Sequence, residues 1–471
     1  MLNILDVIEA ISGSRPDGSG QVISEAAIDS RQVLPGGLFV ALPGERVDGH
    51  EYIADAFRRK ANFALVQKDI SGSFKQIDLR NKKVPETLPE PPFCILVPDS
   101  LAALQQTAKF WRRKLDIRIV AITGSVGKST TKELVAEVLS RRFCTLKSKG
   151  NLNNEIGLPL TLLRLGSGYQ RAVLEMGFYV PGEIAFLCNL ALPQVGVITN
   201  IGTVHAERAG SQEEIARGKS ELIQALPAAP EGVAVLNYDD PFVRPMAEVT
   251  KAKVFYYGLD SKADLWADQI EGMGLQGIRF RLHYRTEVLN LRVPMIGEHS
   301  VHTALRAAAV GLVEGLTWTE IVHGLQEGHS QLRLVVAHTK EGALILDDTY
   351  NASPESTLAA LNLLDEMDGR KIAVIGDMLE LGQYEQRGHE MVGVRAAQFA
   401  SLIVLVGTRS KITADAAIRS GYSPKAIQWF EEAPQAVPYL QETIRNGDVI
   451  LVKGSRGLQM ERIVHALEIE E

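Results

Sequence analysis

The feature that most constrains the fold is residues 119–131, which read IVAITGSVGKSTT. An apolar run leads into a glycine-containing turn and then into the helical pattern TKELVAEVLSRR. A strand, such a turn and a helix in this order are typical of a phosphate-binding loop in an α/β sheet protein. Gly124 and Gly127 permit the tight turn, and the N-terminus of the helix favours an anion. The segment therefore predicts a site for a nucleoside triphosphate.

The residues of this loop also have the chemistry that a triphosphate with a divalent metal requires. Lys128 would place its charge between the β and γ phosphates, and Ser129 would offer its hydroxyl to Mg²⁺. The strict pattern has a glycine where Ile122 stands, so this is a shorter form of the loop. The residues predicted to bind the phosphates are Gly124, Ser125, Val126, Gly127, Lys128, Ser129 and Thr130.

Apolar runs alternate with helical patterns along most of the 471 residues, a length that suggests about three domains. We expect an N-terminal α/β domain over residues 1–97, which ends near the proline-rich stretch KKVPETLPEPP. A central domain over residues 98–330 would contain the phosphate loop and a parallel sheet. Residues 331–471 would form a second open α/β sheet.

Some individual elements can be predicted from spacing and caps. Residues 3–11 form a short helical pattern, and residues 99–115 form a second one that opens with an Asp N-cap. Alternation of apolar and polar residues over 264–293 predicts an antiparallel hairpin added to the parallel sheet. Residues 299–315 follow it as an alanine-rich helix.

Bulk composition restricts the class of protein. The net charge of −7 argues against a nucleic-acid binder that neutralises many phosphates. Cys94, Cys144 and Cys188 are too few and too far apart for a disulfide framework or a zinc cluster, which favours a reducing compartment. The N-terminus lacks a signal-peptide pattern, and no apolar run approaches the roughly 18–20 residues of a membrane span. We therefore expect a cytoplasmic protein without a membrane span.

Polar residues at the ends of apolar runs are the remaining candidates for chemistry. Glu175 closes the run AVLEM and could hold the metal of a phosphate loop. His205 and Lys219 follow the run GVITN, but a lone histidine is more often structural and a helical lysine is usually solvated. In the third block, DDTYNASP, GDMLELG and KGSR follow strands, where ligands of open α/β sheets bind.

These motifs together resemble one family. TGSVGKST, GNLNNEIGLPLTLLRL, LEMG, TNIGTVHAERAGS, ARGKSEL, DDTYNASP, GDMLELG and LVKGSR occur in an order that resembles the Mur ligases, the ATP-dependent amino-acid ligases of bacterial cell-wall precursor synthesis. The resemblance covers nearly the whole chain. The pair DDTYNASP and GDMLELG is the most discriminating part, and it resembles the members that add D-alanyl-D-alanine to UDP-N-acetylmuramoyl-tripeptide.

The resemblance implies three domains: a small UDP-binding α/β domain, a central P-loop ATPase-like domain with a parallel sheet, and a Rossmann-like C-terminal domain. It also implies a reaction in two steps. The terminal carboxylate of the tripeptide attacks the γ phosphate of ATP, which gives an acyl phosphate and ADP. The amine of D-alanyl-D-alanine then attacks the acyl carbonyl, and phosphate leaves.

The resemblance further implies a catalytic group of Lys128, His205, Lys219 and Arg333. Two Mg²⁺ ions would be held by Ser129, Glu175, His205 and Lys219, with Lys219 converted by CO₂ to a carbamate that supplies oxygen ligands. Other ATP contacts would come from Asn154, His299, Asp348, Tyr350 and Asn351, with Asp348 on the ribose. The candidates for binding the UDP-tripeptide and the dipeptide are Ser30, Arg31, His50, Asp377, Glu380, Lys453, Ser455 and Arg456.

One segment departs from the family pattern. The helix that approaches adenine commonly reads G-x-H-N-x-x-N-A in the family, whereas this chain has GEHSVHTA. Ser300 and Thr303 therefore stand where asparagines are common, and a hydroxyl has less hydrogen-bonding capacity than an amide. The sequence leaves open how adenine would be recognised here.

Alternatives remain open at this stage. Another ligase of the same superfamily could add diaminopimelate, lysine or glutamate, although the DNPR motif typical of diaminopimelate-adding members is absent. A P-loop ATPase or nucleotide kinase is the rival from a different class, and a non-catalytic nucleotide-binding module is a third. The partners we expect are small molecules, with no nucleic acid, and the working form we expect is a monomer.

Overall fold

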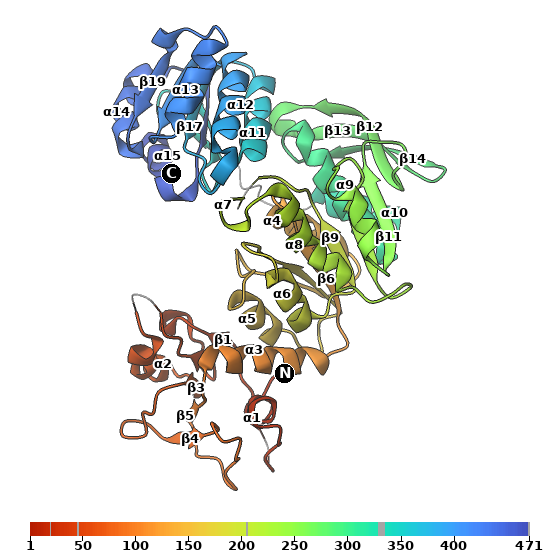
Figure 1. The fold of residues 1–471 in the computed structure, drawn as a ribbon, viewed down its shortest axis with the longest axis vertical. Helices are drawn as coiled ribbons and strands as arrows, with labels where there is room; N and C mark the ends of the chain where they lie inside the picture. The colour runs from red at the N-terminus through yellow and green to blue at the C-terminus, as the bar shows by residue number, and fades with distance from the viewer. Residues whose placement is uncertain (19, 45–46, 204–205, 328–334, 470–471) are drawn as a thin grey trace.

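The computed structural model describes residues 1–18, 20–44, 47–203, 206–327 and 335–469. Three sheets follow one another along the chain, and each lies within one of the three predicted blocks. The N-terminal and C-terminal domains lie at opposite ends of the molecule, with the central domain between them (Figure 1). The three-domain α/β prediction is confirmed. None of the described helices is long and apolar enough to cross a membrane.

The N-terminal sheet has five parallel strands in the order β1-β2-β3-β5-β4. Its three central strands are fully buried, because their apolar runs face helices on one side and the central domain on the other. Its elements are α1 (Ile4–Ser12), β1 (Ala26–Ala27), β2 (Leu38–Val40), α2 (Ile53–Arg58), β3 (Phe63–Val66), β4 (Gln76–Asp78) and β5 (Phe93–Leu96).

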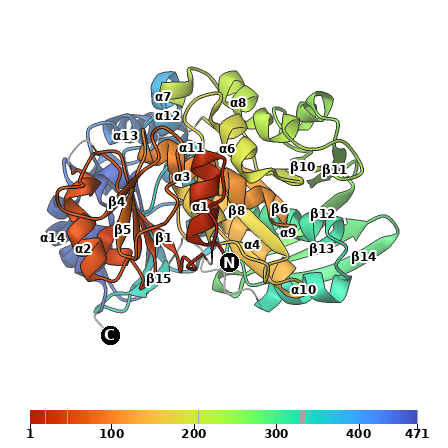
Figure 2. The ribbon, with the colours of Figure 1, turned by 90° about the horizontal axis from the view of Figure 1, so that it is seen from below.

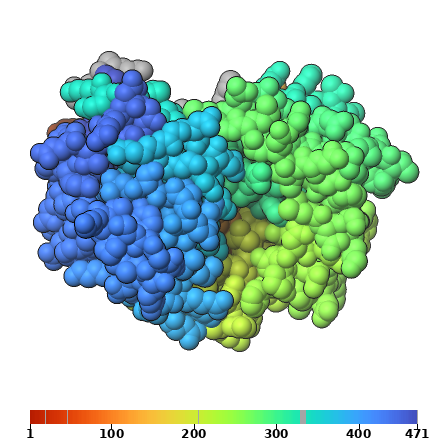
Figure 3. Space-filling model, turned by 90° about the horizontal axis from the view of Figure 1, so that it is seen from above, coloured from red at the N-terminus to blue at the C-terminus, as the bar shows by residue number. Residues whose placement is uncertain are grey.

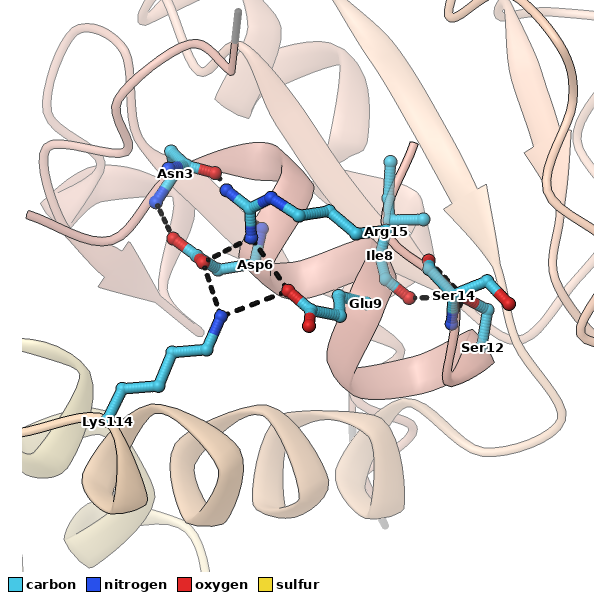
Figure 4. A network of polar contacts seen from close by, with 8 residues as sticks. All are labelled: Asn3, Asp6, Ile8, Glu9, Ser12, Ser14, Arg15 and Lys114. Carbon is cyan, nitrogen blue, oxygen red and sulfur yellow. Dashed lines mark hydrogen bonds and ion pairs between the residues drawn. The ribbon is translucent and has the colours of Figure 1, made fainter. Parts of the chain in front are cut away.

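Helix α3 (Ser100–Arg113) joins this domain to the central one. The Asp99 carboxylate accepts hydrogen bonds from two backbone N–H groups of its first turn, so the predicted N-cap is confirmed. Helix α1 lies beside it (Figure 2). Lys114, just past the end of α3, pairs with Asp6 at 3.1 Å and Glu9 at 3.0 Å, both on α1 (Figure 4). Arg15 contacts the same two carboxylates, so this network fixes α1 against α3.

The central sheet has nine strands in the order β14-β13-β12-β11-β10-β9-β6-β8-β7. Strands β6 to β12 run parallel. Strand β13 runs antiparallel to both of its neighbours, β12 and β14, which confirms the predicted hairpin. Their bounds are β6 (Arg118–Thr123), β7 (Thr145–Lys147), β8 (Arg171–Glu175), β9 (Val195–Ile198), β10 (Val233–Asn237), β11 (Lys253–Gly258), β12 (Leu265–Gly272), β13 (Ile278–Tyr284) and β14 (Glu287–Val293).

Helices cover both faces of the central sheet. Helices α4, α9 and α10 share one apolar core with it, and α3, α5, α6 and α8 share the other, which continues into the N-terminal domain. The bounds of the helices after α3 are α4 (Lys128–Ser140), α5 (Gly157–Leu163), α6 (Glu183–Ala191), α7 (Ala206–Ala209), α8 (Gln212–Gln224), α9 (Val301–Val313) and α10 (Trp318–Glu327).

The C-terminal sheet has six strands in the order β15-β16-β20-β17-β18-β19, and all but β15 are parallel. Helices α11, α12 and α13 cover one face, and α14 and α15 cover the other. The elements are β15 (Val335–His338), β16 (Leu344–Asp348), α11 (Pro354–Glu366), β17 (Arg370–Gly376), α12 (Glu385–Ala397), β18 (Leu402–Val406), α13 (Ser410–Arg419), β19 (Ile427–Phe430), α14 (Ala433–Thr443), β20 (Asp448–Lys453) and α15 (Glu461–Leu467).

Candidate active site

A cleft of about 480 Å³ lies between the central and C-terminal domains. The hollow between these two parts of the molecule is visible in Figure 3. Its walls are the loops at the carboxyl ends of parallel strands in both sheets, which is where open α/β sheets bind ligands. The segments that line it include residues 125–130 after β6, Glu175 at the end of β8, residues 348–353 after β16 and residues 455–457 after β20.

The predicted phosphate loop joins β6 to α4. Gly127 is the N-cap residue in a left-handed conformation, and no side chain caps the first turn of α4. The positive end of the α4 dipole therefore points toward the loop, where an anion would be favoured. The Lys128 ammonium folds back onto the loop, 2.8 Å from the Gly124 carbonyl oxygen and 3.2 Å from that of Ser125.

A neighbouring strand end supports this loop, and sequence reasoning missed it. The N–H of Ser125 donates to the backbone oxygen of Asn200, and the N–H of Val126 donates to the Asn200 side chain. Gly124 lies against Thr199, so a side chain at position 124 would collide with it. These two N–H groups are therefore used within the protein, and they hold the loop against the end of β9. The sequence feature that could have indicated this contact is the polar pair Thr199 and Asn200, directly after the apolar run GVI.

Glu175 ends β8 as predicted, and its side chain is almost fully buried. One carboxylate oxygen accepts from the Ser129 hydroxyl at 2.7 Å, and the other accepts from the Asn153 amide at 2.8 Å. The ammonium of Lys132, a buried residue that the sequence did not single out, lies 3.9 Å away. A hydroxyl and a carboxylate side by side are the oxygen donors that Mg²⁺ prefers.

The neighbouring asparagines are placed differently from the prediction. The Asn154 side chain accepts from the backbone N–H of Ile156 and of Gly157, so it caps α5. Asn153 is the asparagine that contacts Glu175, and Asn151 and Asn153 both line the cleft. In the turn before α5, Asn154 thus bonds to the first N–H groups of the helix, and Asn153 contacts Glu175 in the cleft.

Lys219 on α8 is fully buried directly behind the phosphate loop. Its ammonium is 3.1 Å from the Gly124 carbonyl oxygen and 4.6 Å from the centre of the Phe178 ring. Burial, followed by the charge of Lys128, lowers the pKa of this amine well below its ordinary value. His205 and Arg333 lie outside the described residues. Within the described ranges, no three His, Cys, Asp or Glu side chains gather as a metal site.

Asp348 and Lys453 form an ion pair across two neighbouring strand ends of the C-terminal sheet. The Lys453 ammonium lies 2.6 Å from an Asp348 carboxylate oxygen and 2.9 Å from the Asn351 carbonyl oxygen. The Lys453 side chain is only 2% exposed, so its charge is satisfied within the protein. This position differs from the predicted role of Lys453, because a substrate carboxylate would have to compete with Asp348.

Other predicted residues of the C-terminal domain divide into two sets. Tyr350, Asn351, Glu380, Ser455 and Arg456 line the cleft, and the Arg456 guanidinium lies 5.9 Å from the Tyr350 ring centre. Asp377 faces elsewhere: its carboxylate accepts from the backbone N–H of Ser410 at 2.7 Å, at the start of α13. Its role in this structure is therefore to stabilise the N-terminus of that helix.

The cleft also has an apolar slot beside the phosphate loop. Ile296 and the first residues around α9 line it together with Ala359, Ala360 and Leu363 of α11, and Ile296 packs against the apolar core that contains the last two. The His299 imidazole lies in this region, and burial is the main reason why its pKa is lowered to about 4. His299 is therefore neutral at physiological pH.

Contacts between the central and C-terminal domains close one side of the cleft. Thr203 donates to Glu355 on α11 through both its backbone N–H and its hydroxyl. The backbone N–H of Gln212 donates to the Tyr384 hydroxyl, and the Gln383 amide donates to the Gly210 carbonyl. In the described part of the chain, these contacts around α7 and α11 join the two domains beside the cleft.

The remaining substrate candidates belong to the N-terminal domain, which lies at the opposite end of the molecule from the C-terminal domain (Figure 1). The Ser30 hydroxyl is buried and donates to Asp55, whereas the Arg31 side chain is 80% exposed and pairs with Asp29. His50 is nearly buried, with Nδ1 2.6 Å from Asp48 and Nε2 accepting from the backbone N–H of Gln67. Of these three side chains, Arg31 is the one exposed to a ligand.

Fold and site together define a class: a three-domain α/β enzyme in which a phosphate loop faces a second open α/β sheet across a cleft. The chain matches three Mur ligase domain descriptions in succession. They are "Mur ligase family, catalytic domain" over residues 22–112, "Mur ligase middle domain" over 122–311 and "Mur ligase, glutamate ligase domain" over 332–456. The chain belongs to the Mur ligase family.

Relatives and solved structures agree with this assignment. The chain is 33% identical over 470 residues to the UDP-N-acetylmuramoyl-tripeptide--D-alanyl-D-alanine ligase of Bacillus subtilis, with 98% of each chain covered. It is 34% identical to the enzyme of that name from Escherichia coli, with 96% of this chain and 95% of the relative covered.

Two solved structures of ligases named MurF are also similar. The structure from Acinetobacter baumannii has a TM-score of 0.82 and 31% identity, covering 98% of this chain and 97% of that one. The MurF ligase of Thermotoga maritima, solved in complex with ADP, has a TM-score of 0.76 and 27% identity, covering 94% and 96%.

Proposed function

We propose that this protein is an ATP-dependent ligase that joins D-alanyl-D-alanine to UDP-N-acetylmuramoyl-tripeptide in peptidoglycan precursor synthesis. The observation that carries the proposal is the single cleft in which the phosphate loop and Glu175 face Asp348, Tyr350 and Arg456. A simple ATPase needs no second sheet across its phosphate loop. A ligase does, because it must hold a phosphorylated carboxylate while an amine approaches it.

In this proposal the nucleotide lies along the cleft from the phosphate loop to the apolar slot. The positive dipole end at the N-terminus of α4 and the Lys128 ammonium bind the phosphates. Asp348 accepts a hydrogen bond from the ribose, and its pairing with Lys453 keeps the carboxylate in place. The slot between Ile296 and α11 would then receive the base, because a planar base is bound well between apolar walls.

Mg²⁺ fits the donors present on the central domain. Glu175 and the Ser129 hydroxyl would hold one ion together with phosphate oxygens and water, since Mg²⁺ usually takes only one or two protein ligands at a nucleotide. When bound, the ion would neutralise charge on the phosphates and on the group in transfer. His205 is proposed to help bind a second ion.

The chemical steps follow from this arrangement. The terminal carboxylate oxygen of the tripeptide attacks the γ phosphorus, and the bond to the β-phosphate oxygen breaks to release ADP. The amine of the dipeptide then attacks the acyl carbonyl, loses a proton, and expels inorganic phosphate. The residues of this chain contribute alignment and positive charge, since phosphoryl transfer requires little covalent chemistry from the protein.

We also propose that Lys219 is carbamylated. Its amine is buried beside the Gly124 carbonyl, and burial lowers its pKa well below the ordinary value, which favours the uncharged, nucleophilic form that reaction with CO₂ requires. Growth with ¹³C-bicarbonate should give a carbamyl carbon signal in NMR spectra that Lys219→Ala lacks. Lys219→Ala should also nearly abolish ligation, without rescue by added bicarbonate. Near-normal ligation by this variant would contradict the proposed role.

The remaining parts of the proposal concern the whole chain. The N-terminal domain would hold the UDP group through Arg31, with Ser30 and His50 supporting the loops around it. Domain boundaries at residues 97/98 and 330/331 would be tested by limited proteolysis. A monomer in the cytoplasm is our proposed working form, since one chain supplies both walls of the cleft and its three cysteines are free. Analytical ultracentrifugation tests the monomer.

The decisive experiment measures phosphate release from ATP with UDP-N-acetylmuramoyl-tripeptide, with and without D-alanyl-D-alanine. We expect sustained release only when all three substrates are present. Release that is independent of the UDP-linked peptide would favour a P-loop ATPase. Release that requires the peptide but responds to a different amino acid would favour another Mur-type ligase.

A further inference from the structure

One loop of the C-terminal domain lies between the cleft and the central domain. It comprises residues 377–384, between β17 and α12, and we call it the coupling loop. Leu379 and Glu380 of this loop line the cleft. The contacts that hold the loop are made mainly to its backbone, so they determine the path of the chain.

His389 on α12 holds the coupling loop from within its own domain. Its side chain is fully buried. Nε2 lies 3.2 Å from the backbone nitrogen of Met378, and Nδ1 lies 3.0 Å from the carbonyl oxygen of Glu385. A backbone N–H can only donate and a carbonyl oxygen can only accept, so Nε2 accepts and Nδ1 carries the hydrogen. Burial lowers the pKa of this ring, which favours the neutral form.

Ser455, which follows β20, holds the same part of the loop. Its hydroxyl accepts from the backbone N–H of Leu379 at 2.9 Å, and its own backbone N–H donates to the Asp377 carbonyl oxygen at 3.0 Å. Three consecutive residues of the loop are therefore held through their backbone, and His389 holds the middle one. The direction in which the chain leaves Leu379 follows from these bonds.

The outer side of the loop contacts the central domain. After Leu379 the chain turns through Glu380 and Gly382, which have φ angles of 63° and 53°. The backbone N–H of Glu207 on α7 donates to the Glu380 carbonyl oxygen at 3.3 Å. A Cβ atom at position 382 would lie 2.9 Å from the Glu207 Cα, so glycine is required for this approach. Helix α7 lies next to the C-terminal domain (Figure 1).

Tyr384, at the end of the loop, makes a second contact with the central domain. Its side chain packs against the apolar core that the central and N-terminal domains share. Its hydroxyl accepts from the backbone N–H of Gln212 at 3.3 Å. Gln212 is the first residue of α8, the helix that carries Lys219 behind the phosphate loop. The coupling loop thus connects one wall of the cleft with the start of this helix.

From these contacts we propose that His389 is a positioning residue for the ligation reaction. By holding Met378 it sets the path of the coupling loop, and with it both the place of Glu380 in the cleft and the contact with α7. Loss of the Nε2 acceptor would leave the buried N–H of Met378 without its partner, so the loop would have to move. This proposal rests on the proposed ligase function and adds a residue to it.

The first experiment measures hydrogen–deuterium exchange of the whole chain by mass spectrometry, in peptides that cover residues 206–212. The N–H groups of Glu207 and Gln212 bond across the domain boundary, so their exchange reports this contact without any assay of activity. In His389→Leu we expect exchange there to become at least about fivefold faster, the factor to which one hydrogen bond corresponds. Unchanged exchange in these peptides would overturn the proposal.

A control variant separates positioning from simple support of the fold. Leu440→Ala removes a fully buried side chain of α14, on the opposite face of the same sheet. It weakens the C-terminal domain without touching the coupling loop, so exchange at residues 206–212 should stay as in the wild type. An equal rise in His389→Leu and Leu440→Ala would show that His389 only supports its own domain.

Two conservative variants identify the ring nitrogen that matters. A glutamine side chain can place its oxygen where Nε2 accepts from Met378, whereas the shorter asparagine can replace only Nδ1. His389→Gln should therefore restore most of the protection at residues 206–212, and His389→Asn should not. The same exchange rates in these two variants would contradict the role given to Nε2.

The same variants are then assayed for ligation with ATP, UDP-N-acetylmuramoyl-tripeptide and D-alanyl-D-alanine. In His389→Leu the kcat should fall about tenfold to a hundredfold, because small displacements of groups around a reacting centre cost that much. The affinity for ADP should change by less than about threefold, since the phosphate loop and Glu175 are untouched. Equal losses in kcat and in ADP affinity would contradict a positioning role. Absence of ligation in the wild type would refute the proposed function, and the exchange rates would still decide whether His389 sets the domain contact.

Discussion

Replacing Lys453 by methionine tests how the C-terminal wall of the cleft is built. The side chain of Lys453 is 2% exposed and that of Asp348 is 18% exposed, and their charges are 2.6 Å apart. Methionine fills a similar volume but leaves the Asp348 carboxylate without its cation and the Asn351 carbonyl without its donor. We expect the C-terminal domain to unfold more easily and the loop that carries Asp348 to lose its fixed position.

The magnitude follows from the burial of the two groups. Removing one partner of a fully buried ion pair costs about 3–5 kcal/mol. Because water still reaches part of Asp348, about 2–3 kcal/mol is the expected loss here. For a domain of this size that loss lowers the melting temperature by roughly 5–10 °C. The proposed ribose contact of Asp348 should weaken with it, so the affinity for ADP should fall as well.

The assay is differential scanning calorimetry of the whole chain in a double-mutant cycle. It compares Lys453→Met, Asp348→Asn and the double variant, with the exposed Lys425→Met as the control in the same domain. The double variant should lose less unfolding free energy than the sum of the losses in the two single variants. The difference, which is the coupling free energy of the pair, should exceed about 1.5 kcal/mol. A coupling below about 0.5 kcal/mol would refute the ion pair as the anchor of this loop.

Three further predictions address other parts of the site. Glu175→Gln should remove the effect of Mg²⁺ on ADP affinity, measured by titration with and without the metal; a retained Mg²⁺ effect would contradict its role. His299→Gln should make the stability of the protein less sensitive to acid. The pKa of His299 is about 4 in the folded state and 6.5 ordinarily, so the unfolded chain takes up the proton at a higher pH than the folded one. The stability of the wild type therefore falls as the pH drops from about 6.5 to 4. Urea unfolding at pH 7 and pH 5 should show a larger loss of stability for the wild type than for the variant, and equal losses would reject this. Arg333→Ala should reduce turnover more than ATP affinity if the arginine acts on domain closure, and equal reductions would argue against that.

The sequence was sufficient for elements with a strong local signal. The phosphate loop, the Asp99 cap and the antiparallel strands after residue 264 follow from residue type and spacing, and the structure contains all three. Short edge strands such as β1 and β7, with two and three residues, were not predicted. They are too short to show a periodicity, and pairing with a longer neighbour is what makes them strands.

Side-chain direction at strand ends was less predictable. Asp377 and Asp348 both follow a strand of the same sheet, yet one bonds to the start of α13 and the other faces the cleft. Asn153 and Asn154 are adjacent, yet one contacts Glu175 and the other caps α5. For Asp377 the backbone N–H of Ser410, 33 residues away, decides the direction, whereas for Asn154 the N–H groups are those of the turn that follows it. Residue type and position do not reveal these N–H groups.

Ser300 and Thr303, which stand where the family commonly has asparagines, are a second case in which residue type alone does not predict the hydrogen bonds of a side chain. By residue type, a serine and a threonine offer less than two asparagines, and the sequence therefore argued for weaker recognition of the base. In the structure each hydroxyl is restricted to one role, Ser300 by a carbonyl that can only accept and Thr303 by a guanidinium that can only donate. The role left to each hydroxyl therefore depends on its partner, the Ile296 carbonyl for Ser300 and the Arg306 guanidinium for Thr303, and the residue types at positions 300 and 303 do not reveal these partners.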